Sequence, residues 1–426
     1  MLEELHPHAR RHLRLNFALG VVNGVAFALA DALQDPTLVL SVFIARLTDS
    51  PILVGLLVPV RMGGWFLPQL LISGRVQAAP AKLPYYRMAA ALRISANFAL
   101  ALAALLLPGG GLLLALTFLF MSVNTLSGGL SGLAFTDVVG KTIPSRMRGR
   151  FMAWRMSIGG CLILLGSLVV SYVLDDARGI PFPRDYGILF VLSAVSLAVS
   201  LGSFAFVREP RDRNTRPRAS VPEQLRRATA LPGRNVAYRC FMAARVGFML
   251  AEIAGPFYIL YAKLVFGLPD AIAGSYLMVA TVANIMSTYM WGRVSDGVGN
   301  RAVLRLAALL GVLVPLLAVT AVPAFRALGA PGWFALGYFG LVFALLGVTR
   351  TGIFIGGTNF LLDAAPADDR PIYIGLTNTA TGIASLATAL GGVVVQTAGF
   401  GAVFALALIL YLTAGLVMWR SPEPRR

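Results

Sequence analysis

The polar stretch WGRVSDGVGNR, residues 291–301, separates two long apolar runs, residues 272–290 and 302–322. It contains one acid, three glycines and two arginines. A stretch of this kind predicts a short hinge between two membrane helices, on the side of the membrane where positive charge accumulates. The glycines permit positive φ angles and close helix approach, and Asp296 can cap or bridge a neighbouring helix end.

Parts of this hinge recur earlier in the chain. Gly74-Arg75-Val76 repeats Gly292-Arg293-Val294 at an offset of 218 residues (292 − 74), which is about half of the 426-residue chain. Two further pairs of short motifs occur in the same order in both halves of the chain. The sequence therefore predicts two parallel repeats related by an axis along the membrane normal. These pairs are Pro144-x-x-x-Arg148 with Pro366-x-x-x-Arg370, and Ala45-Arg46-Leu47 with Ala262-Lys263-Leu264.

The composition is that of a polytopic membrane protein. Hydrophobic residues make up 57% of the chain, charged residues 13%, and the mean hydropathy is +0.76, whereas a soluble chain has about 25% charged residues. The net charge of +17 would suggest nucleic acid in a soluble chain. Here the arginines fall in short loops, where they set topology and contact lipid headgroups, so no nucleic-acid partner is expected. Cys161 and Cys240 lie in apolar runs and are predicted to be free thiols, without a metal site.

A spanning helix needs about 20 apolar residues, and twelve such segments can be drawn. The first contains Pro36, which predicts a kink. The run continues past Ala30, so an uncleaved first helix is expected rather than a signal peptide. The segments are residues 15–47, 51–73, 84–107, 112–139, 151–174, 186–207, 236–266, 272–290, 302–322, 333–362, 372–396 and 400–419.

Loop charges predict the domain plan and the orientation. Arginine and lysine concentrate in the loops on one side, which predicts that both termini lie in the cytoplasm. The membrane is expected to be the plasma (inner) membrane. The connector rich in arginine and proline, residues 208–235, is predicted to be a cytoplasmic linker. It separates two six-helix bundles, residues 1–207 and 236–426. A monomer is expected.

With two six-helix repeats, a basic central linker and the pattern Gly292-x-x-x-Asp296-x-x-Gly299-x-Arg301, the whole chain resembles the major facilitator superfamily. The resemblance implies an all-α fold of twelve transmembrane helices in two pseudo-symmetric bundles. It also implies alternating-access transport of a small solute at a central site, with Gly292, Asp296, Gly299 and Arg301 in a gating loop. It does not name the solute.

Four charged residues lie near mid-depth in the predicted spans: Asp31, Arg61, Glu252 and Arg350. A charge at this depth costs about 2.5–3.5 kcal/mol, so these side chains are expected to face an aqueous cavity or each other. Asp31 and Glu252 occupy corresponding places, five and four residues before a proline. Two interpretations stay open: structural ion pairs, Asp31–Arg61 and Glu252–Arg350, or contacts with substrate and proton.

Buried carboxylates can carry a proton at neutral pH, which predicts proton coupling through Asp31 and Glu252. Arginines stay charged, so Arg61 and Arg350 would favour an anionic group on the solute when they are unpaired. In the seventh segment Tyr238, Arg245 and Glu252 recur every seven residues on one face.

Uncharged polar residues at the same depth are weaker candidates for contact with the solute. Asn23 belongs to a polar stripe of the first helix. The others, Asn124, Asn284 and Asn378, lie near mid-depth. Each either contacts the solute or forms hydrogen bonds between helices. Arg93 and Arg155 are predicted to extend their side chains to the cytoplasmic surface.

The sequence therefore predicts a secondary transporter, and no enzyme. The three histidines all lie in the amino-terminal tail, no metal or cofactor is implied, and no Gly-rich nucleotide loop is present. The alternative is a non-transporting membrane receptor or scaffold with the same fold, which the short connector disfavours. The expected partners are a small-molecule substrate and the lipid bilayer.

Overall fold

The computed structural model describes residues 10–69, 76, 79–211, 233, 235–329, 331–366 and 370–423. The repeat mark Gly74-Arg75 and most of the predicted linker 208–235 lie outside these residues. Within the described part of the chain every regular element is a helix. Ten helices are long and apolar enough to cross a membrane. Together with α13 and α16, which span 26 and 18 residues, they account for the twelve predicted segments.

The chain divides into two compact units. The first comprises residues 1–35 and 60–221. It contains α2 (Leu13–Ala32), α6 (Leu83–Leu106), α7 (Gly111–Thr142), α8 (Ser145–Val173), the short η2 (Asp176–Arg178) and α9 (Arg184–Ala205). The π-helical turn η1 (Pro59–Gly63) begins at the boundary between the units.

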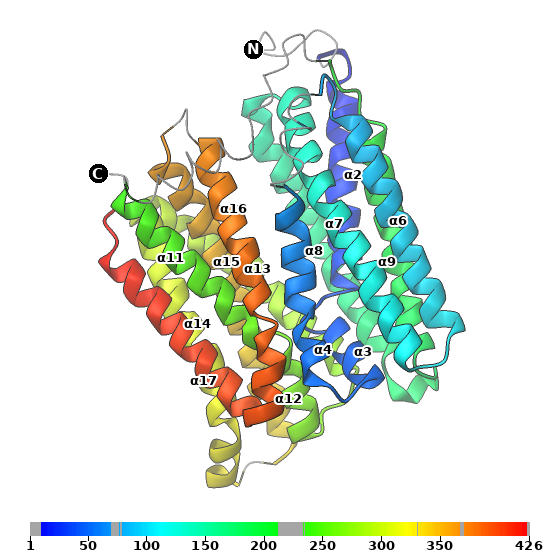
Figure 1. Ribbon diagram of the computed structural model, residues 1–426, viewed down its shortest axis with the longest axis vertical. Helices are drawn as coiled ribbons and strands as arrows, with labels where there is room; N and C mark the ends of the chain where they lie inside the picture. Colours follow the sequence, from blue (N-terminus) through cyan, green and yellow to red (C-terminus); the bar gives the residue numbers. More distant parts are fainter. Residues whose placement is uncertain are drawn as a thin grey trace. The chain divides into compact units, whose positions relative to one another are not determined.

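The second unit comprises residues 36–59 and 222–426, so the segment around Pro36 groups with the second half of the chain. The domain boundary at the linker stays a prediction. This unit contains α3 (Leu40–Leu47), α4 (Pro51–Gly55), α11 (Val236–Ala251), η3 (Glu252–Ala254), α12 (Phe257–Phe266), α13 (Ile272–Gly297), α14 (Asn300–Leu328), α15 (Trp333–Ala364), α16 (Arg370–Ala387) and α17 (Leu390–Arg420) (Figure 1).

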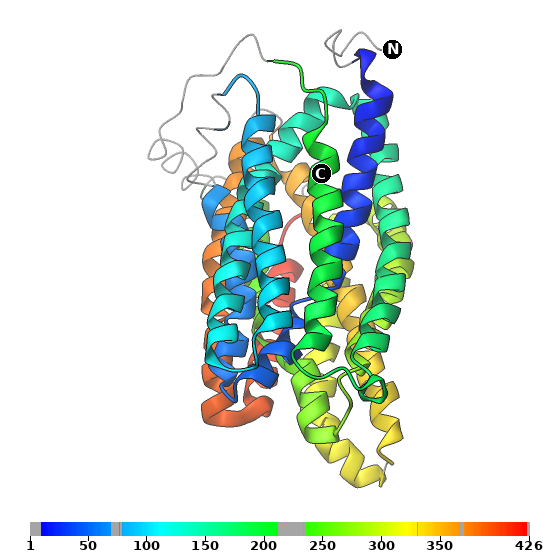
Figure 2. The ribbon, with the colours of Figure 1, turned by 90° about the vertical axis from the view of Figure 1, so that its right-hand side faces the viewer.

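In the first unit, α6 packs against α7 and α9, and α2 packs against α8 and α9. The consecutive helices α6 and α7 lie side by side in both views (Figure 2). The core contains Tyr86, Phe151 and Phe204. Asn23 connects three helices: its amide nitrogen donates to the Tyr86 hydroxyl at 3.2 Å and to the Ser200 carbonyl at 3.0 Å. Polar side chains of this kind hold membrane helices together, because lipid offers them no alternative partner.

In the second unit, α14 packs against α15 and α17, and α11 packs against α17. The segment α4 also packs on α17, where glycine allows the backbones to touch. A Cβ atom on Gly392 would lie 2.3 Å from the Pro51 carbonyl oxygen, and one on Gly55 would lie 2.7 Å from the Gly392 nitrogen. Only glycine permits this approach.

Equivalent contacts in the two units confirm the internal repeat. Arg87 Nε donates to the Ala205 carbonyl at 2.9 Å, and Arg305 Nε donates to the Met418 carbonyl at 3.0 Å. Both arginines lie near the start of the third helix of their repeat, and both carbonyls lie near the end of the sixth. The offsets, 218 residues for the arginines (305 − 87) and 213 for the carbonyls (418 − 205), agree with the spacing seen in the sequence.

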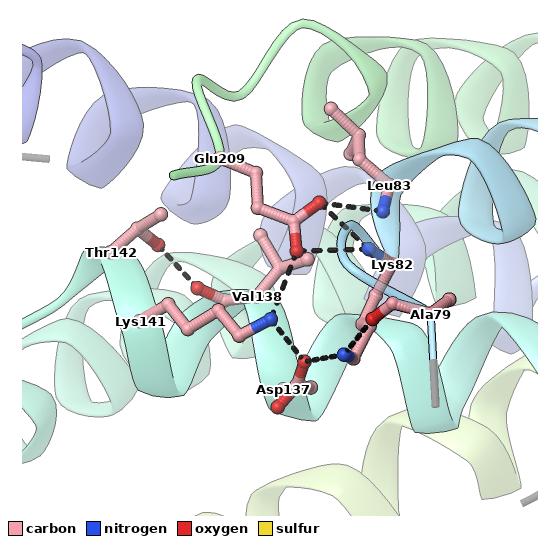
Figure 3. A network of polar contacts seen from close by, with 8 residues as sticks. All are labelled: Ala79, Lys82, Leu83, Asp137, Val138, Lys141, Thr142 and Glu209. Carbon is pink, nitrogen blue, oxygen red and sulfur yellow. Dashed lines mark hydrogen bonds and ion pairs between the residues drawn. The ribbon is translucent and has the colours of Figure 1, made fainter. Parts of the chain in front are cut away.

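A second equivalent contact involves a glutamate that follows the last helix of each repeat. The carboxylate of Glu209 accepts hydrogen bonds from the backbone N–H groups of Lys82 at 2.9 Å and Leu83 at 2.7 Å, and pairs with Lys141 at 3.2 Å (Figure 3). It therefore satisfies amide groups that the start of α6 leaves open. In the second unit, Glu423 lies 3.5 Å from Arg301, next to the start of α14.

The hinge is shorter than the sequence predicts. Helix α13 continues to Gly297, and only Val298 and Gly299 separate it from α14. Within the hinge only Gly299 uses a positive φ, of 111°. The helix continues because one of its faces is buried: Trp291 is 1% exposed and its indole N–H donates to the Val348 carbonyl at 3.0 Å.

Candidate functional site

A two-pronged ion pair in the second unit joins Glu252 and Arg350. Arg350 Nε donates to one carboxylate oxygen at 3.1 Å and Nη2 donates to the other at 2.5 Å. Nη2 also lies 3.3 Å from the Thr37 hydroxyl, in the segment between α2 and α3. The Glu252 side chain is 22% exposed and that of Arg350 is 36% exposed. The pair is therefore two-pronged and partly desolvated, which is a favourable geometry for a charge-assisted hydrogen bond.

The first unit contains the corresponding pair. Arg61 Nη2 donates to a carboxylate oxygen of Asp31. Arg61 lies in η1, the only π-helical turn among the described residues, and such turns are frequent at functional sites. The side chains are 25% exposed for Arg61 and 43% for Asp31, so the carboxylate of this pair is more accessible than its counterpart.

Each carboxylate lies where the first helix of its repeat is interrupted. Helix α2 ends at Ala32, one residue after Asp31, and α3 begins at Leu40 with Pro36 between them. Glu252 begins η3, and Pro256 precedes α12. Proline cannot donate the next helical hydrogen bond. The backbone therefore forms a 3-10 turn, in which the Glu252 carbonyl accepts from Gly255 N at 2.9 Å. The kink predicted at Pro36 is thus an interruption of the helix, and the second repeat has a similar interruption before Pro256.

Two arginines, Arg93 and Arg155, do not extend to the surface as the sequence predicts. Arg93 is 5% exposed, so it does not extend to the surface. Its Nε donates to Asn124 at 2.9 Å and its Nη1 to Ser131 at 3.2 Å. Its guanidinium also lies over the rings of Phe27 at 5.4 Å and Trp65 at 5.8 Å. Neutral oxygens and ring faces therefore solvate this cation inside the bundle.

Arg155 is also held inside the first unit. Its Nη1 donates to the Gly20 carbonyl and, at 3.0 Å, to the Asn23 amide oxygen. Its guanidinium lies 4.7 Å from the centre of the Phe135 ring. A Cβ on Gly24 would lie only 2.5 Å from the guanidinium carbon. The glycine on α2 thus provides the space that brings the arginine against the helix, and the prediction of a surface-directed side chain is wrong.

Arg245 differs from the other arginines at this depth. It lies on α11, seven residues before Glu252, and is partly buried. Among the described residues it has no hydrogen bond and no ion pair. Its Nη1 lies 4.0 Å from the position of a Cβ on Gly357 of α15. Gly357 in turn lies seven residues after Arg350.

The four predicted asparagines have different surroundings. Asn23 is 4% exposed and its amide group is fully engaged between helices. The side-chain oxygen of Asn124 accepts from Arg93. Asn284 on α13 is exposed and Asn378 on α16 is partly buried, and neither has a side-chain hydrogen bond among the described residues. A solute contact at these positions stays a prediction.

The predicted gating residues surround the turn between α13 and α14. Gly292 is helical with open space around it, and Gly299 provides the turn. Arg301 Nη1 donates to the Ser421 carbonyl at 2.9 Å. The carboxylate of Asp296 is exposed and has no partner among the described residues. Asn300, the first residue of α14, is held instead by Asp363, to which its amide donates at 2.6 Å.

Sequence reasoning missed several residues that surround these charges. Thr37 follows Pro36 and had no pattern to single it out, and Ser131 resembles any small residue in a packed helix. Glu209 could have been found as the first acid after the sixth helix, equivalent to Glu423 after the twelfth. The described residues hold no group of three or more His, Cys, Asp or Glu that could bind a metal ion.

Comparison with known proteins agrees with this fold. Residues 25–384 match the model of the Major Facilitator Superfamily, and the chain belongs to that family. It is therefore a membrane carrier of the secondary-transporter class, with the twelve-helix fold.

Solved structures of transporters share the fold at low sequence identity. A mutant form of the nucleoside transporter NupG has a TM-score of 0.72 at 14% identity, over 95% of this chain and 98% of that one. A D-xylose–proton symporter gives 0.66 at 15% identity, over 98% and 99%. An auto-inhibited POT family peptide transporter gives 0.71 at 13%, over 96% and 97%. No curated protein matches the chain.

Proposed function

We propose that this chain moves a small organic solute across the membrane by alternating access, and that protons drive the movement through Asp31 and Glu252. The observation that supports the proposal is the pair of arginine–carboxylate contacts, one in each unit, at the interruption of the first helix of each repeat. One protein of the same fold is, as its name states, a D-xylose–proton symporter.

The chemistry of coupling follows from the pairing. When Glu252 is ionised, Arg350 neutralises it; when Glu252 binds a proton, it becomes neutral and the guanidinium loses its counter-charge. An arginine cannot release its own proton at physiological pH. Protonation of the carboxylate therefore frees Arg350 to contact the solute, and departure of the solute favours loss of the proton. Asp31 and Arg61 would act in the same way in the first unit.

The remaining predicted residues fit this scheme as proposals. Asn284 and Asn378 offer amide groups for the solute, while Asn23 and Asn124 would hold the helices of the first unit together through their hydrogen bonds with Arg155 and Arg93. The loop with Gly292, Asp296, Gly299 and Arg301 would govern movement at the cytoplasmic side. Both termini would lie in the cytoplasm and the membrane would be the inner membrane, as the loop charges predict.

Proteoliposomes that contain a pH-sensitive dye test the proposal. A panel of nucleosides, pentoses, dipeptides and carboxylates is added outside, and luminal pH is followed for the wild type, Glu252→Gln and Asp49→Asn. Asp49 is exposed and lies outside the site, so it is the matched control for loss of a carboxylate. At least one solute should change luminal pH through wild type and Asp49→Asn, but not through Glu252→Gln. Uptake without a pH change, or an unchanged response of Glu252→Gln, contradicts proton coupling.

A further inference from the structure

The interiors of the spanning helices hold more arginines than carboxylates. In the first unit Arg61, Arg93 and Arg155 accompany Asp31, and in the second Arg245 and Arg350 accompany Glu252. Each arginine at this depth costs about 2.5–3.5 kcal/mol unless something compensates its charge. Both units therefore have a surplus of positive charge, and the compensation of each surplus cation has to be found.

Two of the three surplus cations are compensated by fixed protein groups. Arg93 has two side-chain acceptors and two aromatic rings, and Arg155 has a backbone carbonyl, an amide oxygen and two aromatic rings. These contacts need no ligand, because neutral oxygens and ring faces replace the water that the cations lose. Their role is structural.

Arg245 has none of these contacts. It has no hydrogen bond, ion pair or ring contact among the described residues. Glu252 acts on Arg245 through its charge alone, because both of its carboxylate oxygens already accept hydrogen bonds from Arg350. Seven residues also separate Glu252 from Arg245, which is about 10 Å along the helix.

The residue opposite Arg245 has no side chain that could accept a hydrogen bond. Gly357 on α15 has no side chain, and a Cβ placed there would meet Phe241 at 3.7 Å and Arg245 Nη1 at 4.0 Å. These are ordinary contact distances, so a side chain at position 357 fits and would bring its polar atoms to the guanidinium of Arg245. Because glycine stands there, this side of the guanidinium meets no protein acceptor among the described residues, in a partly desolvated place where charge-assisted hydrogen bonds are strong.

We propose that Arg245 binds the anionic group of the solute, a carboxylate or a phosphate, on the side of its guanidinium that faces Gly357. This inference rests on the proposed function and names its substrate class: an organic anion. Glu252 and Arg350 would respond to the proton, while Arg245 would hold the charge of the solute. Both carboxylate and phosphate match the planar fork of a guanidinium.

A pair of variants tests the site without a known ligand. Gly357→Asp places a carboxylate within reach of Arg245, and Gly357→Asn places a neutral group of the same shape. Thermal unfolding of the purified protein should give Gly357→Asp a higher melting temperature than Gly357→Asn. In the Arg245→Gln background the order should reverse, because the new carboxylate would have no cation. A Gly357→Asp protein that melts below Gly357→Asn with Arg245 present overturns the proposal.

Ligand binding then distinguishes the two candidate anionic groups, carboxylate and phosphate. Succinate and glycerol 3-phosphate are compared with the neutral succinamide and glycerol at matched ionic strength. At least one of the two anions should stabilise the wild type, and the neutral partners should not. Arg245→Gln should weaken that binding by about tenfold or more, and Arg245→Lys by less.

Arg93→Gln is the matched control, since it should lower the melting temperature without changing anion affinity. Equal stabilisation by the neutral solutes, unchanged affinity in Arg245→Gln, or no stabilisation by either anion overturns the proposal. The outcome is separate from proton coupling: anion binding that depends on Arg245 but never moves luminal pH would leave this site standing and remove the coupling.

Discussion

Removal of either partner of the Glu252–Arg350 pair should destabilise the second unit, and removal of both should cost less than the sum. The direct attraction of two unit charges about 4 Å apart is about 4 kcal/mol at an effective dielectric constant of about 20. The side chains are 22% and 36% exposed, so solvent screens part of it. A coupling energy of about 1.5–3 kcal/mol is expected, as for a hydrogen bond to a charged group.

The assay is a double-mutant cycle with Glu252→Gln, Arg350→Gln and the double variant, followed by intrinsic tryptophan fluorescence during thermal unfolding in detergent. Each single variant should lower the melting temperature by about 5 °C, on the scaling known for soluble domains of this size. The double variant should recover part of this loss, because no uncompensated charge is left. Strict additivity of the two single variants would refute the reasoning, since it would mean that the two groups do not interact.

Three further variants test the packing of each unit by the same unfolding assay. Glu209→Gln should cost about 1–3 kcal/mol because the amide groups that begin α6 lose an ionised acceptor; an unchanged melting temperature would contradict this capping. Gly392→Ala should cost about 1–3 kcal/mol, since its Cβ would meet backbone atoms at 2.3 Å, whereas Gly292→Ala, which meets nothing within 4 Å, should be harmless. Gly24→Ala should cost about 1–2 kcal/mol by displacing Arg155, and wild-type stability would show that this contact does not form.

Much of the fold could be predicted because lipid imposes simple rules on the sequence. Apolar runs of about 20 residues mark the spans, and Pro36 marks the break in the first of them. The extent of α13 could not be predicted, because it depends on Trp291, whose indole bonds a carbonyl of α15. Nor does a pattern in one helix reveal that residues 36–59 pack with the second half, since this depends on glycine contacts between distant segments.

The site was predictable in part for the same reason. The predicted depth of a residue in the membrane is enough to identify charges that need a partner. Both expected pairings, Asp31 with Arg61 and Glu252 with Arg350, are present. Depth fails for Arg93, because its compensation comes from neutral groups on another helix. Those partners carry no charge, so composition and spacing do not distinguish them from any other polar residue in a packed helix.

The most direct test is the accumulation of a solute identified in the luminal pH assay, measured against an imposed pH gradient. With the membrane potential held at zero, a carrier that moves one proton with each solute molecule should raise the inside-to-outside ratio about tenfold for each pH unit, because one unit corresponds to about 1.4 kcal/mol. Wild type should follow the gradient, and Glu252→Gln should equilibrate the solute without concentrating it. Concentration of the solute by Glu252→Gln to the wild-type level would contradict the account.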